Sequence, residues 1–511
     1  MKIFFILLLI AAVAAPLEAA LTRGPYLQDS TPSSIVIRWR TSTAETSRVI
    51  YGTNFTAQIL TNTDATSVTE HIVTLTSLAS DTKYFYTLGA TNTVLAGNTV
   101  NHFFLTHPPS GTPKPLRVWI IGDAGTATAN QVNVRNAFET WNGTNTLHAW
   151  LQLGDNAYNS GLDTEYQSAV FNIYTNELRN SVTWSTLGNH ETAQATTFVD
   201  TYPYFSIFTL PTAGEAGGVA SGTEHWYSFD LGMVHFICLD SMTADRSTNG
   251  AMATWLRSDL AVTTNRWLIA FWHHPPYSKG SHDSDVGGVS YDTQMGQMRT
   301  NFLPILENGG VDLVFCGHSH SFERSKLLNG HYGISGTFNA ANHVIQTGSG
   351  RETNEVGAYR KPDGLGERPI GNRGTIYTVA GSAGQATTGL TNHPAMFYSV
   401  LSLGSVVLDF NSNRLNAVFI RDTGATNDYY TIIKDGTYPP VLNNLTALTN
   451  GNVQFTILTR GFRTNLVEAS SDLAANAWQT IGTNITTTNT SFTFTHTNAL
   501  TNSNQFYRVR R

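Results

Sequence analysis

Five short motifs in this chain combine glycine with side chains that can bind metal ions. In chain order they are GDAG (122–125), GDNAY (154–158), GNHE (188–191), AFWH (270–273) and GHSH (317–320). Each accompanies a short apolar run, and a buried strand that ends at a glycine turn presents polar side chains at the edge of its sheet. Carboxylate, imidazole and amide groups together suit iron, zinc or manganese better than calcium. The five motifs therefore predict a transition-metal site.

The spacing within two of the motifs indicates which imidazoles share that site. Alternate residues of an extended chain point the same way, so His318 and His320 can face one metal centre. By the same rule His274, directly after His273, is expected to point away from it. A single Gly-Asp turn or a single histidine is usually structural. The prediction depends on the five motifs occurring together.

From residue 116 onward, apolar strands alternate with helical segments. The sequence predicts helices over 130–141 and 294–307, the second ending at Gly309-Gly310. Strand, ligand loop and helix in succession are typical of a layered α/β domain with its site at the strand ends. Residues 327–373 are rich in Gly, Asn and Thr, and we expect a long loop region there that could overhang the site.

Strand-like segments flank this central region on both sides. Residues 21–109 show short alternating strands that predict a β-sandwich, followed by a Pro- and Gly-containing linker at 108–113. A second boundary is expected at Tyr438-Pro439-Pro440, before a β-patterned tail over 441–511 without a catalytic cluster. The predicted units are therefore 1–20, 21–109, 114–436 and 441–511.

The composition favours an exported protein. Charged residues make up 13% of the 511 residues, hydrophobic residues 41%, and the net charge is −6. No basic stripe is present, so we expect no stable nucleic-acid partner. Lys2, the apolar run 3–10 and the small residues 11–20 predict a signal peptide, with an uncleaved anchor as the alternative. We expect no transmembrane segment and a secreted, periplasmic or cell-surface location.

The two cysteines, Cys238 and Cys316, each lie within an apolar run. We expect two buried free thiols in core strands. A disulfide between neighbouring strands is the alternative in an oxidising compartment.

Residues 116–434 resemble a purple acid phosphatase, a branch of the calcineurin-like metallophosphoesterases, on the strength of all five motifs. Residues 22–107 resemble the fibronectin-III-like domain that precedes the catalytic domain in many members. The resemblance implies an α/β catalytic domain, an αββα metallophosphoesterase sandwich, flanked by an N-terminal β-sandwich and a C-terminal all-β module. The tail resembles β modules of secreted bacterial proteins, which implies possible attachment to the cell surface.

The resemblance also implies a dinuclear metal centre, an Fe(III) ion beside a divalent Fe, Zn or Mn ion. Asp155 would bridge the two ions. Gly125 stands where other metallophosphoesterases carry a histidine, and Tyr158 supplies a phenolate, a hard anionic ligand that favours trivalent iron. The implied ferric ligands are Asp123, Asp155, Tyr158 and His320, and the divalent ion would add Asn189, His273 and His318.

Catalysis is implied to proceed by attack of metal-bound hydroxide on a phosphate monoester. Two metal ions ~3.5–4 Å apart can clamp phosphate oxygens and activate water. His190 and His282 are the implied catalytic residues, and with Asn189 they would bind substrate. Asp283 stands where the plant pattern has a second histidine, which predicts weaker binding of highly charged substrates such as polyphosphates. Glu191 is expected to support the His190 loop.

The sequence therefore predicts an exported acid phosphatase acting on small-molecule phosphate monoesters. A phosphodiesterase or nucleotidase on the same metal site is the first alternative. A surface-binding protein with a vestigial catalytic domain is the second. The complete set of ligand residues favours an enzyme, because degenerate sites usually lose a ligand.

Overall fold

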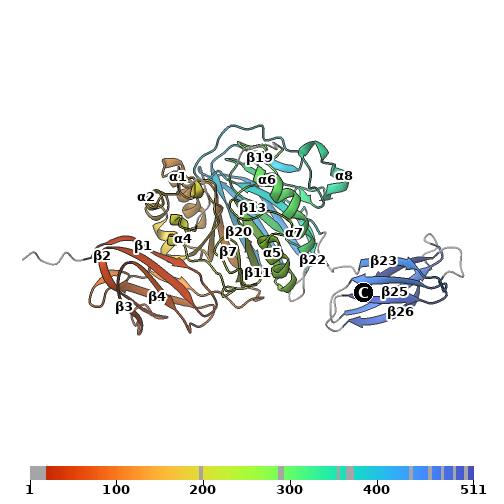
Figure 1. Cartoon of the computed structure of the whole chain (residues 1–511), viewed down its shortest axis with the longest axis horizontal. Helices are drawn as coiled ribbons and strands as arrows, with labels where there is room; N and C mark the ends of the chain where they lie inside the picture. The colour runs from red at the N-terminus through yellow and green to blue at the C-terminus, as the bar shows by residue number, and fades with distance from the viewer. Residues whose placement is uncertain are drawn as a thin grey trace, which may run out of the picture.

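The computed structural model describes residues 19–194, 200–285, 293–353, 357–363, 373–436, 441–458, 463–472, 477–486, 491–499 and 505–510 (Figure 1). Nearly all of the predicted signal peptide and the predicted boundary at 438–440 lie outside these residues. Within them, no helix is both long and apolar enough to cross a membrane.

The N-terminal strands form an antiparallel arrangement around the long strand β2. Alternate residues of β2, including Ile35, Ile37 and Trp39, are buried in a core that also contains Tyr86 and Phe104. β2 pairs with β1, β3 and β4. The strands are β1 (Leu21–Gln28), β2 (Ile35–Gly52), β3 (Leu60–Leu75), β4 (Lys83–Gly89), β5 (Val94–Ala96) and β6 (Phe103–Leu105).

These N-terminal strands are joined to the central sheet, which the sequence did not predict. Leu27 of β1 pairs in parallel with Val182 of β9, so one sheet runs through both regions. Arg23 and Arg40 both bind the carboxylate of Asp163, at 2.9 and 2.6 Å. Sequence patterns locate strands, but a single long-range pairing such as this depends on tertiary contacts.

The central region consists of two packed sheets. The first has the order β17-β22-β21-β20-β7-β8-β9 and the second the order β10-β11-β12-β13-β18-β14-β19. Strands of the first are β7 (Leu116–Ile121), β8 (Ala149–Gln152), β9 (Val182–Ser185), β17 (Tyr359–Pro362), β20 (Gly404–Asn411), β21 (Arg414–Arg421) and β22 (Thr426–Gly436). Strands of the second are β10 (Tyr227–Leu231), β11 (Val234–Cys238), β12 (Trp267–Trp272), β13 (Leu313–Cys316), β14 (Phe322–Ser325), β18 (Ile376–Ala380) and β19 (Met396–Val400).

Helices lie on the outer faces of the two sheets, which gives the predicted αββα sandwich (Figure 1). α1 packs against β20 and β21, and α5 packs beside α7. Gly310 ends α7 with a φ of 82°, the left-handed conformation expected there. The helices are α1 (Ala129–Asn142), α2 (Asp163–Tyr166), α3 (Thr175–Asn180), α4 (Pro203–Ile207), α5 (Ala251–Val262), α6 (Thr293–Gln297), α7 (Leu303–Gly309) and α8 (Ala340–His343).

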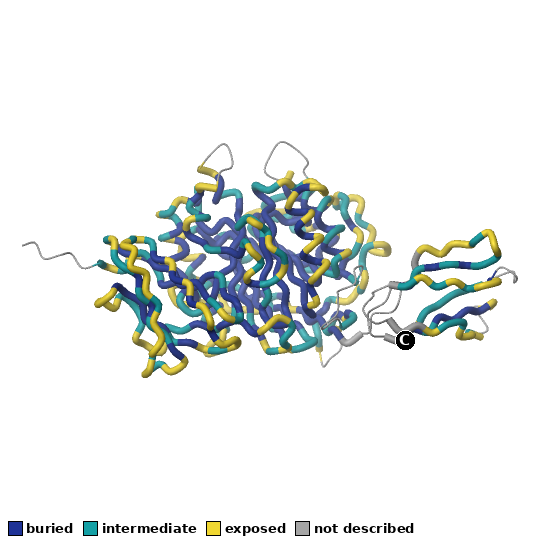
Figure 2. Tube along the Cα trace, turned by 60° about the horizontal axis from the view of Figure 1, so that its bottom comes forward, coloured by how far each residue is buried: buried dark blue, intermediate teal, exposed yellow. Residues whose placement is uncertain are grey.

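Strand β12 shows how the layers are divided. Trp267, Ile269 and Phe271 belong to the large core between the sheets. The intervening Leu268, Ala270 and Trp272 belong to a second core that includes residues of α5 and α7. The strand is therefore apolar on both faces and fully buried, and Figure 2 shows the buried residues concentrated in this central body.

Both cysteines are buried and free, as the sequence analysis favoured. Cys238 of β11 faces the large core and Cys316 of β13 faces the second core. Strand β12 separates their strands in the sheet, so the alternative of a disulfide between neighbouring strands is wrong.

Residues 327–373 contain more regular structure than the expected long loop. Their described parts include β15 (Leu327–Leu328), α8, β16 (Val344–Gln346) and β17. β15 pairs with β16 in a two-stranded sheet, and β17 joins the edge of the first large sheet. These strands are only two to four residues long and lie between segments rich in Gly, Asn and Thr, so they show no period in the sequence.

The tail forms a separate all-β unit, drawn at the right of Figure 1. Two three-stranded sheets enclose a small core that includes Val453, Phe455, Ile457 and Val467. Its strands are β23 (Val441–Ala447), β24 (Val453–Leu458), β25 (Arg463–Ser470), β26 (Gln479–Thr486), β27 (Ser491–His496) and β28 (Phe506–Arg510).

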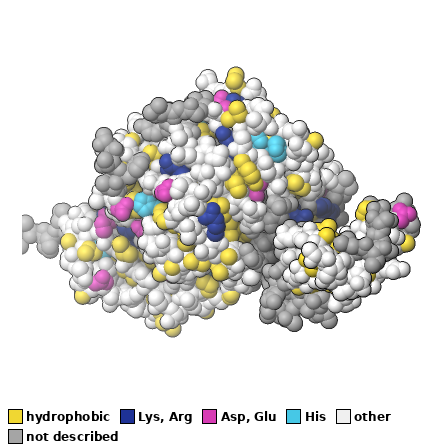
Figure 3. Space-filling model, turned by 45° about the vertical axis from the view of Figure 1, so that its right-hand side comes forward, with side chains coloured by type: hydrophobic (Ala, Val, Ile, Leu, Met, Phe, Trp, Pro, Cys, Tyr) yellow, Lys and Arg dark blue, Asp and Glu magenta, His cyan; other side chains and the backbone are white. Residues whose placement is uncertain are grey.

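The surface of the molecule carries few charges. On the face in Figure 3, charged side chains occur singly or in small groups, as the low charged content predicts.

Candidate metal centre

The five motifs meet where parallel strands of the two sheets end. β7, β8 and β9 are parallel neighbours in one sheet, and β12 and β13 are parallel neighbours in the other. Asp123, Asp155 and His318 have positive φ angles of 55°, 51° and 67°. Such left-handed backbone is uncommon for residues with side chains and is a frequent feature of functional sites.

Three of the predicted ligands converge on the phenol oxygen of a fourth, Tyr158. Tyr158 Oη lies 3.2 Å from Asp123 Oδ1, 3.2 Å from Asp155 Oδ2 and 3.3 Å from His320 Nε2. His320 Nε2 is itself 3.6 Å from Asp123 Oδ1. These residues are buried or half-buried, so two carboxylates, a phenol and an imidazole share one small volume.

The other three predicted ligands converge beside this group. Asn189 Oδ1 lies 2.9 Å from His318 Nδ1 and 3.0 Å from His273 Nε2. His273 Nε2 is also 3.4 Å from Asp155 Oδ2. The oxygen Asp155 Oδ2 therefore touches both groups, which is the placement that a bridging carboxylate needs.

Hydrogen bonds outside the ligand set orient these side chains. His273 donates from Nδ1 to the carbonyl of Leu153 at 2.8 Å, which leaves Nε2 facing the site. The backbone N–H of His190 donates to Asp155 Oδ1 at 2.9 Å. The buried carboxylate of Glu191 accepts the N–H of Asn156 and of Gly188, each at 2.7 Å. Glu191 thus ties two ligand loops together rather than the His190 loop alone.

Gly125 is packed directly against the loop that carries Tyr158. A Cβ at Gly125 would lie 2.2 Å from the backbone nitrogen of Ala157, which no side chain could tolerate. The backbone N–H of Tyr158 donates to the carbonyl of Gly125 at 2.9 Å. A histidine cannot occupy position 125 in this arrangement, and Tyr158 supplies the polar atom there instead.

Electrostatics of the site fit a cation. Burial together with the charges of Asp155 and Asp123 raises the pKa of Tyr158 well above its usual value. Burial alone would raise the pKa of Asp155, but the charges and hydrogen bonds of His273 and His190 together outweigh it and lower that pKa. Two carboxylates and a phenol held this close repel one another once ionised, and metal cations at the same place would offset that repulsion. Atoms of Asp123, Asp155 and His273 lie within 4.8 Å of one another, a spacing that one ion can satisfy.

Comparison with known proteins agrees with this geometry. Residues 116–322 match the family model of the calcineurin-like phosphoesterases. This part of the chain is therefore a calcineurin-like phosphoesterase domain.

Similar proteins include plant purple acid phosphatases. Purple acid phosphatase 18 of Arabidopsis thaliana is 33% identical over 147 residues, 28% of this chain and 31% of that protein. Purple acid phosphatase 1 of Ipomoea batatas is 29% identical over 241 residues, 44% of this chain and 46% of that protein. The chain thus spans less than half of either relative.

The fold of the phosphoesterase domain and its flanking strands is also found in solved structures. Purple acid phosphatase PPD1 from yellow lupin seeds superposes with a TM-score of 0.60 at 20% identity, over 81% of this chain and 74% of that chain. The structure of PhoD gives a TM-score of 0.56 at 13% identity, over 83% of this chain and 95% of that chain. At these identities the likeness shows the fold.

His190 and His282 border the phosphoesterase site from different loops. His190 donates from Nδ1 to the carbonyl of Asn159 at 2.7 Å, and its ring centroid lies 4.4 Å from that of Tyr158. His282 stacks on His318 with ring centroids 3.8 Å apart. Both rings are half-buried, so each can reach solvent and the ligand cluster.

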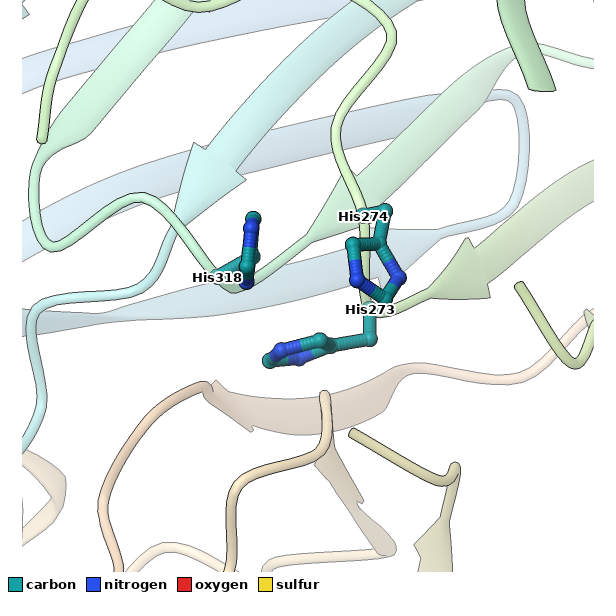
Figure 4. A group of neighbouring side chains, drawn as sticks. All are labelled: His273, His274 and His318. Atoms are coloured by element: carbon teal, nitrogen blue, oxygen red, sulfur yellow. The ribbon is translucent and has the colours of Figure 1, made fainter. Parts of the chain in front are cut away.

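His274 does not point away from the site, contrary to the sequence analysis. Its ring centroid lies 4.4 Å from that of His318, and a ring nitrogen lies within 4.8 Å of nitrogens of His273 and His318 (Figure 4). The Nδ1 atom bonds Ser241 Oγ at 2.9 Å. The chain turns after Trp272 at the end of β12, so the alternation of an extended strand no longer applies there.

Asp283 forms an ion pair with Lys279, which bears on the weaker binding of highly charged substrates that the sequence predicted. Lys279 Nζ lies 2.7 Å from Asp283 Oδ2 and 2.9 Å from Asp285 Oδ2. The Asp283 carboxylate is therefore not an isolated negative charge facing the site. Lysine four residues before a carboxylate is a common pattern, and the sequence alone did not reveal which groups the loop brings together.

Sequence reasoning missed Gln385, whose Nε2 lies 3.1 Å from His320 Nε2. Gln385 follows the apolar run 376–380 and two glycines, the same strand-and-glycine pattern that marks the five motifs. Because the segment GSAGQ has no carboxylate or imidazole, it was not recognised as part of a metal site.

Proposed function

We propose that this chain is an exported acid phosphatase that hydrolyses small-molecule phosphate monoesters at a dinuclear Fe(III)–M(II) centre. The observation that supports this most strongly is the position of Asp155 Oδ2, 3.2 Å from Tyr158 Oη and 3.4 Å from His273 Nε2. One carboxylate oxygen that touches two separate donor groups is the arrangement that holds two metal ions together.

Each donor group has chemistry suited to one ion. In the proposed site Asp123, Asp155, Tyr158 and His320 hold Fe(III), because anionic oxygens suit a trivalent ion. Asn189, His273 and His318, with the shared Asp155, hold a divalent Fe, Zn or Mn ion, which neutral nitrogen and amide oxygen ligands suit. Such a pair supplies Lewis acidity toward phosphate oxygens and lowers the pKa of water.

The surrounding side chains would bind and protonate the substrate. Asn189, His190 and His282 lie at the edge of the ligand cluster and can contact phosphate oxygens. An imidazole must carry a proton to protonate the leaving alkoxide, so we expect activity to be greatest in the acidic range. Glu191 and the Leu153 carbonyl keep the ligand loops in place.

The rest of the chain would support export and attachment. We propose that residues 1–20 are a signal peptide, that 21–109 and 114–436 form a fibronectin-III-like domain and the catalytic domain, and that 441–511 form an independent module. Attachment of that module to the cell surface is consistent with its lack of a catalytic cluster among its described residues.

Metal analysis of the purified protein, combined with a panel of phosphoesters, tests this proposal. We expect two metal ions per chain, including iron, and faster turnover of monoesters than of diesters. Faster turnover of diesters than of monoesters would favour the phosphodiesterase alternative. A protein without metal or turnover would favour a vestigial domain.

Asp155→Ala provides the matching variant. Removing the shared carboxylate leaves two mutually repelling cations, so metal binding and activity should be lost together. Asp245→Ala, which changes an exposed carboxylate, is the control and should retain both. An Asp155→Ala protein with two metal ions and normal turnover would refute the assignment.

A further inference from the structure

The loop after β18 approaches the metal centre although it contains none of the five motifs. β18 is the parallel neighbour of β13, with Val379 opposite Cys316. The loop GSAGQ (381–385) therefore leaves the sheet at the same edge as GHSH (317–320). Parallel strands deliver their following loops to a common edge, where sites form.

Two glycines allow this loop to lie directly on the ligand loops. A Cβ at Gly381 would be 2.4 Å from the carbonyl oxygen of Ser319 and 2.8 Å from Asp123 Oδ2. A Cβ at Gly384 would be 2.6 Å from the carbonyl oxygen of Asp123. Backbone contact this close fixes where the next side chain, Gln385, emerges.

Gln385 emerges on the side of His320 that would face a metal ion. His320 Nδ1 lies 3.5 Å from Thr387 Oγ1, and the N–H of Thr387 donates to the His320 carbonyl at 3.2 Å. The other ring nitrogen, Nε2, faces Tyr158 and the Gln385 carboxamide. The Gln385 Nε2 atom lies 3.1 Å and the Tyr158 Oη atom 3.3 Å from this same nitrogen, so the carboxamide and the phenol are neighbours.

The carboxamide chemistry suits this position. A glutamine side chain carries two N–H donors on one nitrogen and an acceptor oxygen. The neighbouring groups are rich in negative oxygen, from Asp123, Asp155 and Tyr158. A neutral carboxamide can donate to an anionic ligand there, and unlike a carboxylate it adds no negative charge that would repel a phosphate.

We propose that Gln385 is a substrate-binding residue of this site. One N–H of its carboxamide donates to the Tyr158 phenol oxygen, and the other donates to an oxygen of the phosphate group. This inference rests on the proposed function, and it assigns a role to a side chain outside the motif set.

Gln385→Leu tests the proposal on the metal-loaded protein. We expect unchanged iron content, inorganic phosphate bound about tenfold more weakly by calorimetry, as for loss of one net hydrogen bond, and a visible absorption band at longer wavelength. The band moves because losing a donor hydrogen bond raises the energy of the phenolate electrons. Gln346→Leu, a glutamine on β16 that bonds Arg360, is the matched control and should leave all three unchanged.

Thermal melting of both variants separates a local effect from misfolding, and Gln385→Met replaces Gln385→Leu if the latter does not fold. A folded, iron-loaded variant with the phosphate affinity and band position of the wild type would overturn this inference. The proposed function would still stand. A wild-type protein that binds neither iron nor phosphate would overturn the proposed function and this inference with it.

Discussion

Glu191 accepts the backbone N–H of Asp155 on its buried carboxylate, with Oε2 2.8 Å from the nitrogen. The same carboxylate accepts the N–H groups of Asn156 and Gly188, and the hydroxyl of Tyr166 lies 3.3 Å away. One side chain therefore fixes the two loops that carry Asp155, the proposed bridging carboxylate, and Asn189.

Glu191→Gln should lower both stability and metal content. The amide nitrogen would oppose at least one backbone N–H, and an unsatisfied buried donor costs about 1–3 kcal/mol. Chemical denaturation and metal analysis of the purified variant measure the two effects.

Glu307→Gln is the control, because Glu307 is also buried and accepts three hydrogen bonds, but from Gly330, Tyr332 and Tyr377. It should lose stability and keep its metal. Equal metal loss in both variants would argue against a specific role for Glu191.

His282→Ala should slow turnover while leaving the metal content intact. His282 stacks on His318 and is not among the proposed ligands. A positioned general acid contributes ~10²–10⁴-fold, and the loss should be greatest for esters with poor leaving groups, which most need the proton. Steady-state kinetics with alkyl and nitrophenyl phosphates measures this difference. Equal losses for both esters would show that His282 is not the proton donor and would leave His190 as the candidate.

A buried histidine far from the strand-end motifs should make stability depend on pH. His235 lies between Asp230 and Asp259, at 2.7 and 2.8 Å. Burial alone would lower the pKa of His235, but the two carboxylates raise it to about 10. A raised pKa means that the stabilisation is complete below the ordinary value of about 6.5 and is lost as the pH rises toward about 10.

His235→Gln tests this dependence. Removing one partner of a buried ion pair costs roughly 3–5 kcal/mol. The difference in unfolding free energy between wild type and His235→Gln should therefore be large at pH 6 and smaller at pH 9.5. Comparing the two proteins at each pH cancels the titrations that they share. A difference that does not change with pH would mean that His235 is neutral when folded.

The clustering of the candidate ligands could be predicted from the sequence because each of them follows a strand signal in chain order. Asp123 and Asp155 follow apolar runs and glycine, and parallel strands bring such residues to one edge. The helix at Ala129–Asn142 was predicted as 130–141 for a similar reason, since its apolar residues recur with helical spacing.

Relationships between distant segments could not be predicted in this way. The pairing of Leu27 with Val182 and the approach of Gln385 to His320 join residues far apart in the chain. The ion pairs of Lys279 depend on how one loop folds back. His274 was misplaced because the backbone turns at the end of β12. Periodicity describes local backbone, and these contacts depend on packing.

The colour of Tyr158→Phe tests the central claim, a ferric ion held by a tyrosine. Tyr158 Oη lies 3.2 Å from both Asp123 and Asp155. A phenolate bound to Fe(III) transfers charge in visible light, so the iron-loaded wild type should be violet or pink. Tyr158→Phe keeps the ring and removes only the oxygen. The account predicts a visible band in the wild type that disappears in Tyr158→Phe, and a band that persists in the variant, or is absent from the iron-loaded wild type, would contradict it.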